Sequence, residues 1–415
     1  MGHKKVFSAI ALAVAGALAA GTAGATNGYF QHGYGMKAKS MAGVGIALPQ
    51  DALAAATNPA GMVIVGNRID FGADLFRPVR DSQLTLGPGP FGAEYSGNGD
   101  KMFLIPEFGY NRMLTPNSSI GVSVYGNGGM NTNYETINTA TGGGIFGTGN
   151  LGVDLTQLFI SPTYSVKVSP QHALGISLNL AYQRFKAEGL QNFDNAFFSA
   201  APGFVTNKGY DSSTGYGLRF GWLGELTPTL SVGATYQTKT RMSRFDKYRG
   251  LFAEQGDFDI PENFGLGIAF KAAPGTTMAA DVQRINYSKV NSVGNSGNIP
   301  AQLGSSNGPG FGWRNMTVLK LGVSHALNSG LTLRGGISHG RQPIPSTETF
   351  FNVLAPGVIE SHLTLGATWT LANKSELTVG YMHGFNKSVT GTGPTTGFSS
   401  KMYQDSLGIA YGWKM

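Results

Sequence analysis

The chain of 415 residues contains 62 glycines and no cysteine, and only 13% of its residues are charged. About a quarter of the residues of a soluble enzyme are usually charged, so this composition argues against such an enzyme and suits a wall that faces lipid. The lack of cysteine excludes disulfides and thiolate metal sites. The seven histidines have no metal-ligand spacing, so we expect neither a metal nor another cofactor.

Residues 1–25 have the layout of a secretory signal peptide. Lys4 and Lys5 precede an apolar run over 6–20, and Ala23-Gly24-Ala25 supplies a small-residue cleavage site. The run is shorter than the ~20 apolar residues that a membrane-spanning helix needs. We expect a mature chain that begins at residue 26, and loss of the two lysines lowers the formal net charge from +7 to +5. The remaining basic residues are scattered, which argues against a nucleic-acid partner.

Residues 26–66 do not follow a strand pattern. This segment includes LPQDALAAATNPAGM at 48–62, in which alanine has low strand propensity and proline cannot donate to a strand ladder. The run 51–57 predicts a short helix with Asp51 as its N-cap and Pro59 as its stop. We therefore expect a compact helical segment ahead of the rest of the chain.

From residue 67 to residue 415 the pattern has period two, with apolar residues alternating with small or polar ones. The segments of this kind are 67–76, 101–113, 118–126, 153–168, 172–186, 213–226, 229–242, 260–271, 276–287, 315–326, 331–340, 359–371, 375–385 and 403–415. Short turns alternate with long loops between them, and most segments reach the length of a tilted membrane strand. This pattern indicates an all-β fold, a transmembrane antiparallel barrel of about 14 strands, and argues against a soluble β-sandwich.

A barrel of this size encloses more space than its own side chains fill. Residues 26–66 are therefore predicted to be a hatch, a plug inside the lumen of the barrel formed by 67–415. At the C-terminus, Leu407, Ile409, Tyr411 and Trp413 alternate with small residues and resemble the assembly signal of bacterial outer-membrane barrels, although Lys414-Met415 replaces the usual terminal aromatic residue. We expect insertion by the barrel-assembly machinery into the outer membrane of a Gram-negative bacterium.

Three longer segments resemble the FadL family of outer-membrane long-chain fatty acid and hydrocarbon transporters. GYFQHGYGMKAKSMAGVGIALPQDALAAATNPAGM at 28–62 is similar to the family's hatch, and GVSVYGNGGMNTNY at 121–134 and GVDLTQLFISPTYS at 152–165 are similar to its third and fourth strand regions. The resemblance implies ligand sites inside the barrel and a kinked third strand that opens the wall toward lipid. The composition of Gly126-Asn127-Gly128-Gly129 permits such a kink.

The resemblance also implies a function, which is passive, gated uptake of long-chain fatty acids or related hydrophobic compounds. It assigns binding and gating roles to Asn58, Pro59 and Ala60, and it places Gly28, Tyr29 and Phe30 beside the ligand. The alternative for the Asn58–Gly61 corner is a simple helix stop and turn. We expect a monomer surrounded by outer-membrane lipid and lipopolysaccharide.

Three bases fall on the lumen-facing set of the alternating pattern: Arg219, Lys320 and Arg334. A charge at mid-strand on the lipid side costs about 2–4 kcal/mol, which also favours an inward direction. We expect that one of them receives a carboxylate head group. The alternative is that they pair with lumen acids such as Asp281 or Glu107, or meet water.

Aromatic residues are frequent in the long loops, where exposed apolar side chains would capture a lipid-like molecule. The candidates are Phe193, Phe197, Phe198 and Phe204, with Phe146 and Leu151 in a neighbouring loop. The rival interpretation is interface packing or contact with lipopolysaccharide.

One enzyme motif is present, because Gly336–Gly340 matches G-x-S-x-G around Ser338. A nucleophile elbow needs a strand that turns into a helix, whereas Pro343 and Pro345 follow here, so we expect no enzyme activity unless Ser338 lies beside a histidine and a carboxylate. Two other functions stay open. One is transport of aromatic or alkane hydrocarbons, for which the lumen bases would be dispensable, and the other is a structural or adhesion barrel without cargo.

Overall fold

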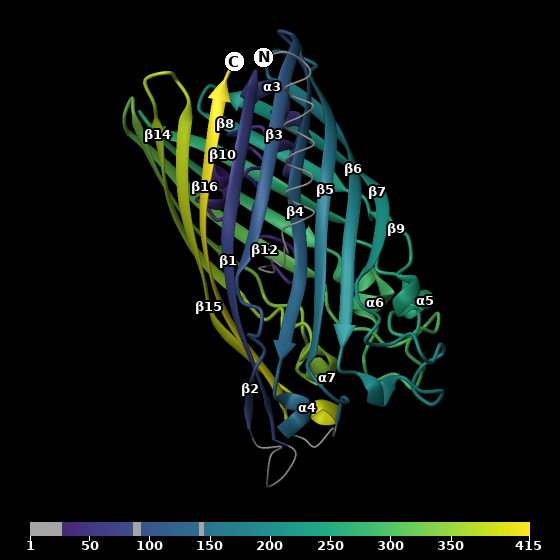
Figure 1. The fold of residues 1–415 in the computed structure, drawn as a ribbon. Coiled ribbons are helices and arrows are strands. Elements are labelled where there is room, and N and C mark those ends of the chain that lie inside the picture. The colour runs from purple at the N-terminus through teal and green to yellow at the C-terminus, as the bar shows by residue number, and fades with distance from the viewer. Residues whose placement is uncertain (1–26, 86–92, 141–144) are drawn as a thin grey trace.

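The computed structural model of the protein describes residues 27–85, 93–140 and 145–415, so the predicted signal peptide lies outside the described residues. Within them, one antiparallel sheet closes on itself, because β1 pairs with β16 along its whole length. Figure 1 shows the yellow β16 beside the purple-blue β1. Fourteen strands build the wall, while the short β2 (Glu94–Ser96) and β9 (Arg241–Met242) add to β1 and β7. The predicted barrel is confirmed.

The wall strands follow one another around the barrel in chain order. They are β1 (Arg68–Leu84), β3 (Phe103–Thr115), β4 (Ser118–Tyr134), β5 (Leu151–Lys167), β6 (His172–Glu188), β7 (Asp211–Thr227), β8 (Leu230–Gln237), β10 (Asn263–Ala273), β11 (Thr276–Ile285), β12 (Met316–Asn328), β13 (Leu331–His339), β14 (Ser361–Thr370), β15 (Glu376–Thr390) and β16 (Phe398–Lys414).

Each of the fourteen predicted segments overlaps a wall strand, but several boundaries differ. β15 ends five residues after the predicted 385, and β16 begins five residues before the predicted 403. β1 and β4 each continue eight residues past the predicted ends at 76 and 126, and the segment 229–242 is interrupted between β8 and β9. Pro78 explains the error for β1, since a proline argues against a central strand. Here β1 pairs with β3 only as far as Phe76, so Pro78 lies where β1 pairs with β16 alone.

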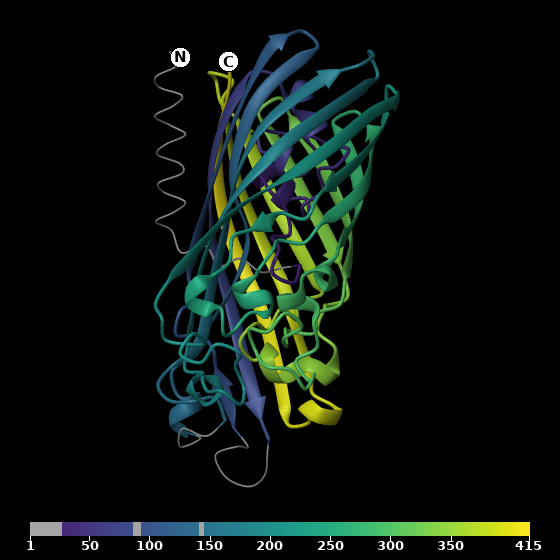
Figure 2. The same ribbon diagram turned by 90° about the vertical axis from the view of Figure 1, so that its right-hand side faces the viewer.

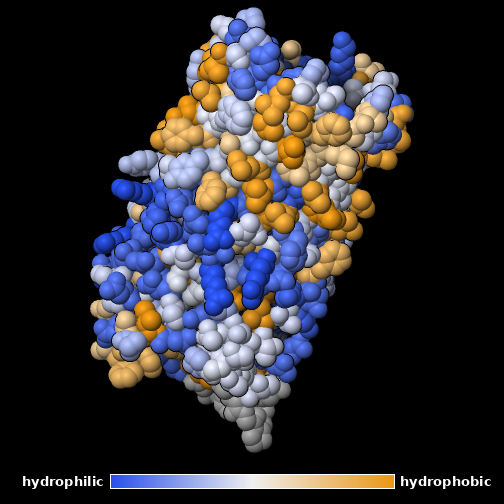
Figure 3. Space-filling model, turned by 180° about the vertical axis from the view of Figure 1, so that it is seen from behind, coloured by the Kyte–Doolittle hydropathy of each residue, from blue (hydrophilic) through white to orange (hydrophobic). Residues whose placement is uncertain are grey.

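The alternation of side chains matches a wall between lipid and lumen. On β6, Leu174, Ile176, Leu178 and Leu180 are each about 40% exposed on the outside, while the residues between them point inward. Figure 3 shows the outer surface on the opposite side of the barrel, where apolar side chains also form a belt. The outward apolar set is therefore the lipid-facing side, as the sequence predicts.

Short helical turns occur in the hatch and in the loops at the opposite end. They are α2 (Met36–Lys39), η1 (Ala54–Ala56), η2 (Pro59–Gly61), α3 (Met62–Val65), α4 (Ile137–Ala140), η4 (Gln191–Phe193), η5 (Asp246–Tyr248), α5 (Ala253–Gly256), η6 (Tyr287–Lys289), α6 (Asn291–Gly294), η7 (Ser346–Glu348), α7 (Thr349–Asn352) and η8 (Gly393–Thr395), where η marks a 3₁₀-helix. None of the helices in the described part of the chain is long and apolar enough to span a membrane.

The hatch, residues 27–66, lies inside the ring of strands, as the dark purple trace in Figure 2 shows. The helix expected over 51–57 is wrong in extent, because only the 3₁₀ turn η1 forms. Asp51 still accepts a hydrogen bond from the Leu53 amide at 3.0 Å. A run this short cannot nucleate an α-helix alone, and Ala52 bonds to the wall instead. Its amide donates to Asp70 at 2.9 Å and its carbonyl accepts from Ser123 at 2.7 Å.

Glycines of the wall face the hatch at almost every strand. A Cβ at Gly175 would lie 2.3 Å from the Pro59 carbonyl carbon, and a Cβ at Gly221 would lie 2.0 Å from the Asn58 side-chain oxygen. The other members of this glycine girdle are Gly109, Gly121, Gly233, Gly265, Gly267, Gly322, Gly336, Gly366, Gly380 and Gly408. The hatch therefore packs on the bare backbone of the wall, which gives many of the chain's glycines a structural reason.

Gly175→Val should displace the Asn58–Gly61 corner from the wall, because the added side chain needs space that the hatch backbone occupies. We expect a folded, heat-modifiable barrel whose hatch has become accessible to trypsin at Lys37 and Lys39, and which conducts ions in planar bilayers. Gly335→Val is the matched control, since a Cβ there meets no atom closer than 3.6 Å. Equal protease resistance of the two variants would refute the close packing of the hatch on Gly175.

Candidate functional site

Asn58 fastens the hatch to the barrel wall. Its side-chain amide donates to the Ile46 carbonyl at 2.7 Å and to the Trp222 carbonyl of β7 at 2.9 Å. Its side-chain oxygen accepts from the Ala60 amide at 3.1 Å, so it also caps η2, with Pro59 at the first helical position. The corner is thus a helix cap and a wall contact at once, and its gating role stays a prediction.

A buried ion cluster lies beside α2. The Lys39 ammonium group is 3.2 Å from Asp74 of β1 and 3.3 Å from Glu107 of β3, and all three side chains are at most 5% exposed. Glu107 also accepts from the Gly35 amide at 3.2 Å. One hatch cation therefore satisfies two wall carboxylates that would otherwise be buried without compensation.

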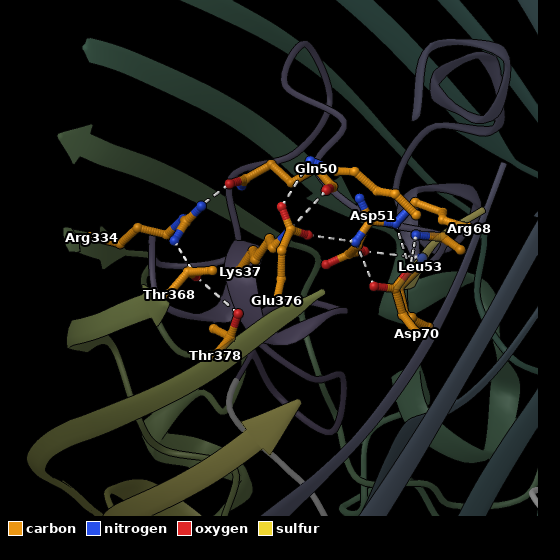
Figure 4. Close-up of polar contacts among 12 residues, drawn as sticks. Lys37, Gln50, Asp51, Leu53, Arg68, Asp70, Arg334, Thr368, Glu376 and Thr378 are labelled. Atoms are coloured by element: carbon orange, nitrogen blue, oxygen red, sulfur yellow. Dashed lines mark hydrogen bonds and ion pairs between the residues drawn. The ribbon is translucent and has the colours of Figure 1, made fainter. Parts of the chain in front are cut away.

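A second ion cluster lies nearer the start of β1 than the first, and Figure 4 shows its members converging from the hatch and the strands. Lys37 of the hatch lies 2.6 Å from Glu376 of β15, which also binds Arg68 of β1 at 3.0 Å. Arg68 in turn binds Asp70 at 2.6 Å. Ion pairs thereby link the hatch with the first strand β1 and the second-last strand β15, close to where β1 pairs with β16.

The three predicted head-group bases all point into the lumen, as expected, and each donates a hydrogen bond to the hatch. The contacts are Arg219 to the Thr57 carbonyl at 3.1 Å, Lys320 to the His32 carbonyl at 2.9 Å and Arg334 to the Gln50 side chain at 3.1 Å. With the hatch seated, these donors are used to hold it. Ligand binding by any of them stays a prediction and requires that the hatch shift.

The two acids that the alternative interpretation pairs with those bases bind the hatch as well. Asp281 of β11 accepts from the Gly45 and Ile46 amides at 2.8 and 3.1 Å, and Glu107 binds Lys39. The lumen-facing charges of both signs thus converge on one segment. The polar half of the lumen serves mainly to position the hatch.

A register irregularity lies at the predicted position in the third wall strand, while the lateral opening of the wall there stays a prediction. β4 shifts register between Gly126 and Gly128 against β5, and its pairing with β3 stops at Tyr125. The N-terminal segment lies against this interruption, because Phe30 forms a bridge with Gly128 and the Gly129 amide donates to the Tyr29 carbonyl at 3.0 Å. A Cβ at Gly128 would lie 1.8 Å from the Tyr29 carbonyl oxygen, so only glycine allows this approach.

An aromatic box surrounds the same N-terminal segment. The ring centre of Tyr29 lies 5.1 Å from that of Tyr287, 5.7 Å from that of Trp313 and 6.0 Å from that of Phe258. Tyr287 also donates to the Asn27 carbonyl. The box belongs to a continuous apolar cluster that fills the lumen from the N-terminal segment to the long loops. Gly28, Tyr29 and Phe30 therefore lie at the hatch end of this packed apolar cluster.

Sequence reasoning missed Arg80, a buried base on β1. Its guanidinium donates to the Asn131 carbonyl at 2.6 Å and to the Asp100 carbonyl, while its Nε, among the described residues, has no hydrogen-bond partner. A small apolar gap beside it is lined by Gly28 and Trp313, among other residues. The predicted strand ended at residue 76, before Pro78, so the inward position of Arg80 was not recognised.

The predicted exposure of the loop aromatics is only partly right. Phe197 is 80% exposed and Phe198 is 43% exposed, as capture residues should be. Phe193 and Phe204 are half-buried, and Phe204 lies under the Arg249 guanidinium at 3.2 Å. Phe146 and Leu151 are buried in the apolar cluster instead of being exposed in a loop. Packing of the loops on one another explains this difference.

Ser338 does lie beside a histidine, because its hydroxyl is 3.1 Å from Nδ1 of His362. The other ring nitrogen of His362 faces the Gln404 side-chain amide at 3.2 Å, where a catalytic triad has a carboxylate. Ser338 is also paired on both sides, next to the last residue of β13, and does not lie on a strand-to-helix elbow. The arrangement is a buried polar contact of the wall.

A closed barrel of fourteen strands with an internal hatch and a lipid-facing belt is an outer-membrane channel in architecture. Residues 12–411 match the family described as "Outer membrane protein transport protein (OMPP1/FadL/TodX)", and the chain belongs to this family. It is therefore a protein of the Gram-negative outer membrane, from a family of transport channels. The resemblance drawn from the hatch sequence is confirmed.

Solved structures of similar fold come from the same family. The toluene transporter TodX of Pseudomonas putida superposes with a TM-score of 0.71 at 18% identity, over 93% of this chain and 99% of that one. A FadL homologue of Pseudomonas aeruginosa gives 0.70 at 14% identity over 93% and 99%. The toluene transporter TbuX of Ralstonia pickettii gives 0.64 at 18% identity over 92% and 99%. Comparison with functionally curated proteins gives no match.

Lys39→Met should loosen the hatch, because it leaves Asp74 and Glu107 buried without their cation. We expect a cost of about 3–5 kcal/mol to the seated state, which is more than a hundredfold in the hatch-opening equilibrium. Hydrogen exchange at the α2 amides measures it. Lys401→Met is the control, because its ion pair with Glu94 is exposed and contributes under about 1 kcal/mol. Equal exchange in both variants would contradict the prediction.

Burial in the hatch, and secondly the nearby Asp70 carboxylate, raises the pKa of Asp51 to about 7. The seated hatch thus holds this proton more tightly than an unseated hatch with an ordinary aspartate, so the contribution of Asp51 is complete below about pH 4 and is lost as pH rises toward 7. The hatch-opening equilibrium of the wild type, divided by that of Asp51→Asn, should therefore increase from pH 4 to pH 7 and then level off. Bilayer conductance measures this ratio, and a ratio independent of pH would disprove the assignment.

Proposed function

We propose that the protein mediates passive, gated uptake of long-chain fatty acids or related hydrophobic compounds. The observation that carries this proposal is the seat of the N-terminal segment. Gly28–Gln31 lies at one end of the apolar cluster and at the same time lies against the part of β4 that no longer pairs with β3. A cargo that displaces this segment meets a gap in the wall that leads toward lipid.

The proposed route has three stages. The exposed Phe197 and Phe198 collect the cargo from outside, and the apolar cluster of the lumen carries it inward. Rearrangement of the hatch, beginning at its N-terminal segment, then releases the cargo through the lateral opening at Gly126–Gly129. Each buried CH₂ group contributes about 0.8 kcal/mol, so an acyl chain is retained without any chemical step.

Arg80 supports a cargo with an acidic head group. It is a buried guanidinium without a carboxylate partner within 4 Å among the described residues, and it borders the gap beside Gly28. A carboxylate would compensate this charge and accept from the free Nε, an interaction that is stronger than a neutral hydrogen bond. Arg80, in place of Arg219, Lys320 or Arg334, is our first choice as the head-group residue.

Aromatic or alkane hydrocarbons are the second candidate cargo. The box of Tyr29, Tyr287 and Trp313 presents several ring faces and edges, which suits a flat apolar ring. TodX and TbuX, with the same fold, are named as toluene transporters. A barrel with only a structural or adhesion role is the third candidate.

The proposal includes the partners of an outer-membrane monomer. We infer assembly by the barrel-assembly machinery from the alternation that ends β16, and contact of the outer belt with membrane lipid and lipopolysaccharide. No nucleic acid and no catalytic step takes part.

Uptake by a deletion strain that expresses each variant separates the candidates. Arg80→Gln should lower oleate uptake at least about tenfold and leave toluene uptake unchanged, since a charged hydrogen bond is worth about 1.5–3 kcal/mol. Arg77→Gln is the control, because it removes a base from the same strand at an exposed ion pair. Unchanged oleate uptake in Arg80→Gln would favour the neutral cargo. If the wild type restored uptake of none of oleate, toluene and an alkane, the transport proposal would be wrong, and a structural or adhesion role would be the remaining candidate.

A further inference from the structure

The outer surface of β10–β14 has a recess that the transport path does not use. Two positions on the lipid-facing side carry small residues, Ala280 of β11 and Gly335 of β13, where their neighbours are large. The recess between those neighbours has a volume of about 630 Å³. Its rim consists of Ile268, Phe270, Met278, Leu321, Ile337 and Leu365. The size and apolar lining suit a hydrocarbon chain.

A cleft of about 560 Å³ lies on the same strands, toward the long loops. It is lined by four cations, Arg284, Arg314, Arg341 and Lys387, and by one acid, Glu360. Lys387 binds Glu360 at 2.6 Å, while the three arginines form no ion pair with any described residue. The lining therefore has a formal excess of three positive charges. Such an excess on a largely uncharged chain attracts anionic groups to this face.

The strand register fixes how the recess and the cleft are related. Ala280 pairs with Leu321, and four residues further along β11 Arg284 pairs with Thr317 of β12, to which it donates at 2.7 Å. At about 3.3 Å per residue, the cations begin roughly 13 Å from the floor of the recess. Figure 3 shows this face, with strongly hydrophilic side chains gathered next to the apolar belt.

The direction of the long loops decides which leaflet is involved. The loops that follow β11 and β13, at 286–315 and 340–360, are the long kind that faces the cell exterior in outer-membrane barrels. The cleft thus lies where the head groups of the outer leaflet meet the wall, and the recess lies further along the strands, among their acyl chains. Neither faces the lumen.

We propose that this face binds a phosphorylated, multiply acylated glycolipid of the outer leaflet, the lipid A part of lipopolysaccharide. The arginines bind its phosphate groups by charged hydrogen bonds, and one acyl chain fills the recess over Gly335. A second copy of this chain would bring like charges together, and a free phosphate would leave the recess unexplained. The inference depends on the outer-membrane location and not on the identity of the transported cargo.

Native mass spectrometry of the purified protein, titrated with bisphosphorylated lipid A in the presence of EDTA, tests the proposal. Arg314→Gln combined with Arg341→Gln should weaken binding at least about tenfold. The control is Arg241→Gln combined with Arg244→Gln, two exposed bases in and just after β9, and it should change binding less than about twofold. Gly335→Leu should weaken binding by filling the recess. Heat modifiability verifies that each variant is folded.

Glu360→Gln provides a test that misfolding cannot imitate. Removing the one acid of the cleft frees Lys387, so binding of lipid A should become tighter. Enzymatically dephosphorylated lipid A should bind poorly, and inorganic phosphate in excess should not displace intact lipid A. The proposal is overturned if the arginine variant and its control behave alike, if Glu360→Gln weakens binding, if Gly335→Leu binds as tightly as the wild type, or if phosphate alone displaces the lipid. Oleate and toluene uptake should be unchanged in these variants, which separates this result from the proposed transport function.

Discussion

The space inside a barrel of fourteen strands is the constraint on which the rest of this structure depends. The lumen is too wide for wall side chains to fill, and the chain fills it with its own residues 27–66. The hatch fits only where the wall carries no inward side chain, which is why glycines such as Gly175, Gly221 and Gly336 face it. Polar groups then fix the position that the glycines permit. Lys39, together with the wall carboxylates around it, provides the strongest of these contacts.

This arrangement divides the hatch into a fixed part and a part that is easier to move. Residues 36–65 are held by buried ion pairs, by Asn58 and by close backbone packing, all of which are costly to break. The N-terminal segment is held differently, by a few backbone hydrogen bonds to the kinked β4 and by aromatic contacts with Tyr287 and Trp313. An apolar cargo competes directly with the aromatic contacts, so it acts on the weaker part first.

Much of the fold could be predicted from sequence because the membrane imposes it. Lipid on one side and a hatch on the other force every strand to alternate, and that alternation is local in sequence. The strand ends were less predictable, since Pro78 is tolerated only because β3 no longer pairs beside it. The partners of Arg219, Lys320 and Arg334 could not be predicted either, because each is a hatch atom distant in sequence. The inward position of Arg80 was hidden by the same proline.

The measurement that tests this division most directly is hydrogen exchange on the full protein, with and without oleate. The account predicts that cargo raises exchange at the amides of Gln31 and Gly129, which join the N-terminal segment to β4. The amides of Lys39 and Ser40, at the end of α2, should keep their protection. If α2 exchanged as readily as the N-terminal segment, or if only α2 responded to oleate, the hatch would move as one body and the account would be wrong.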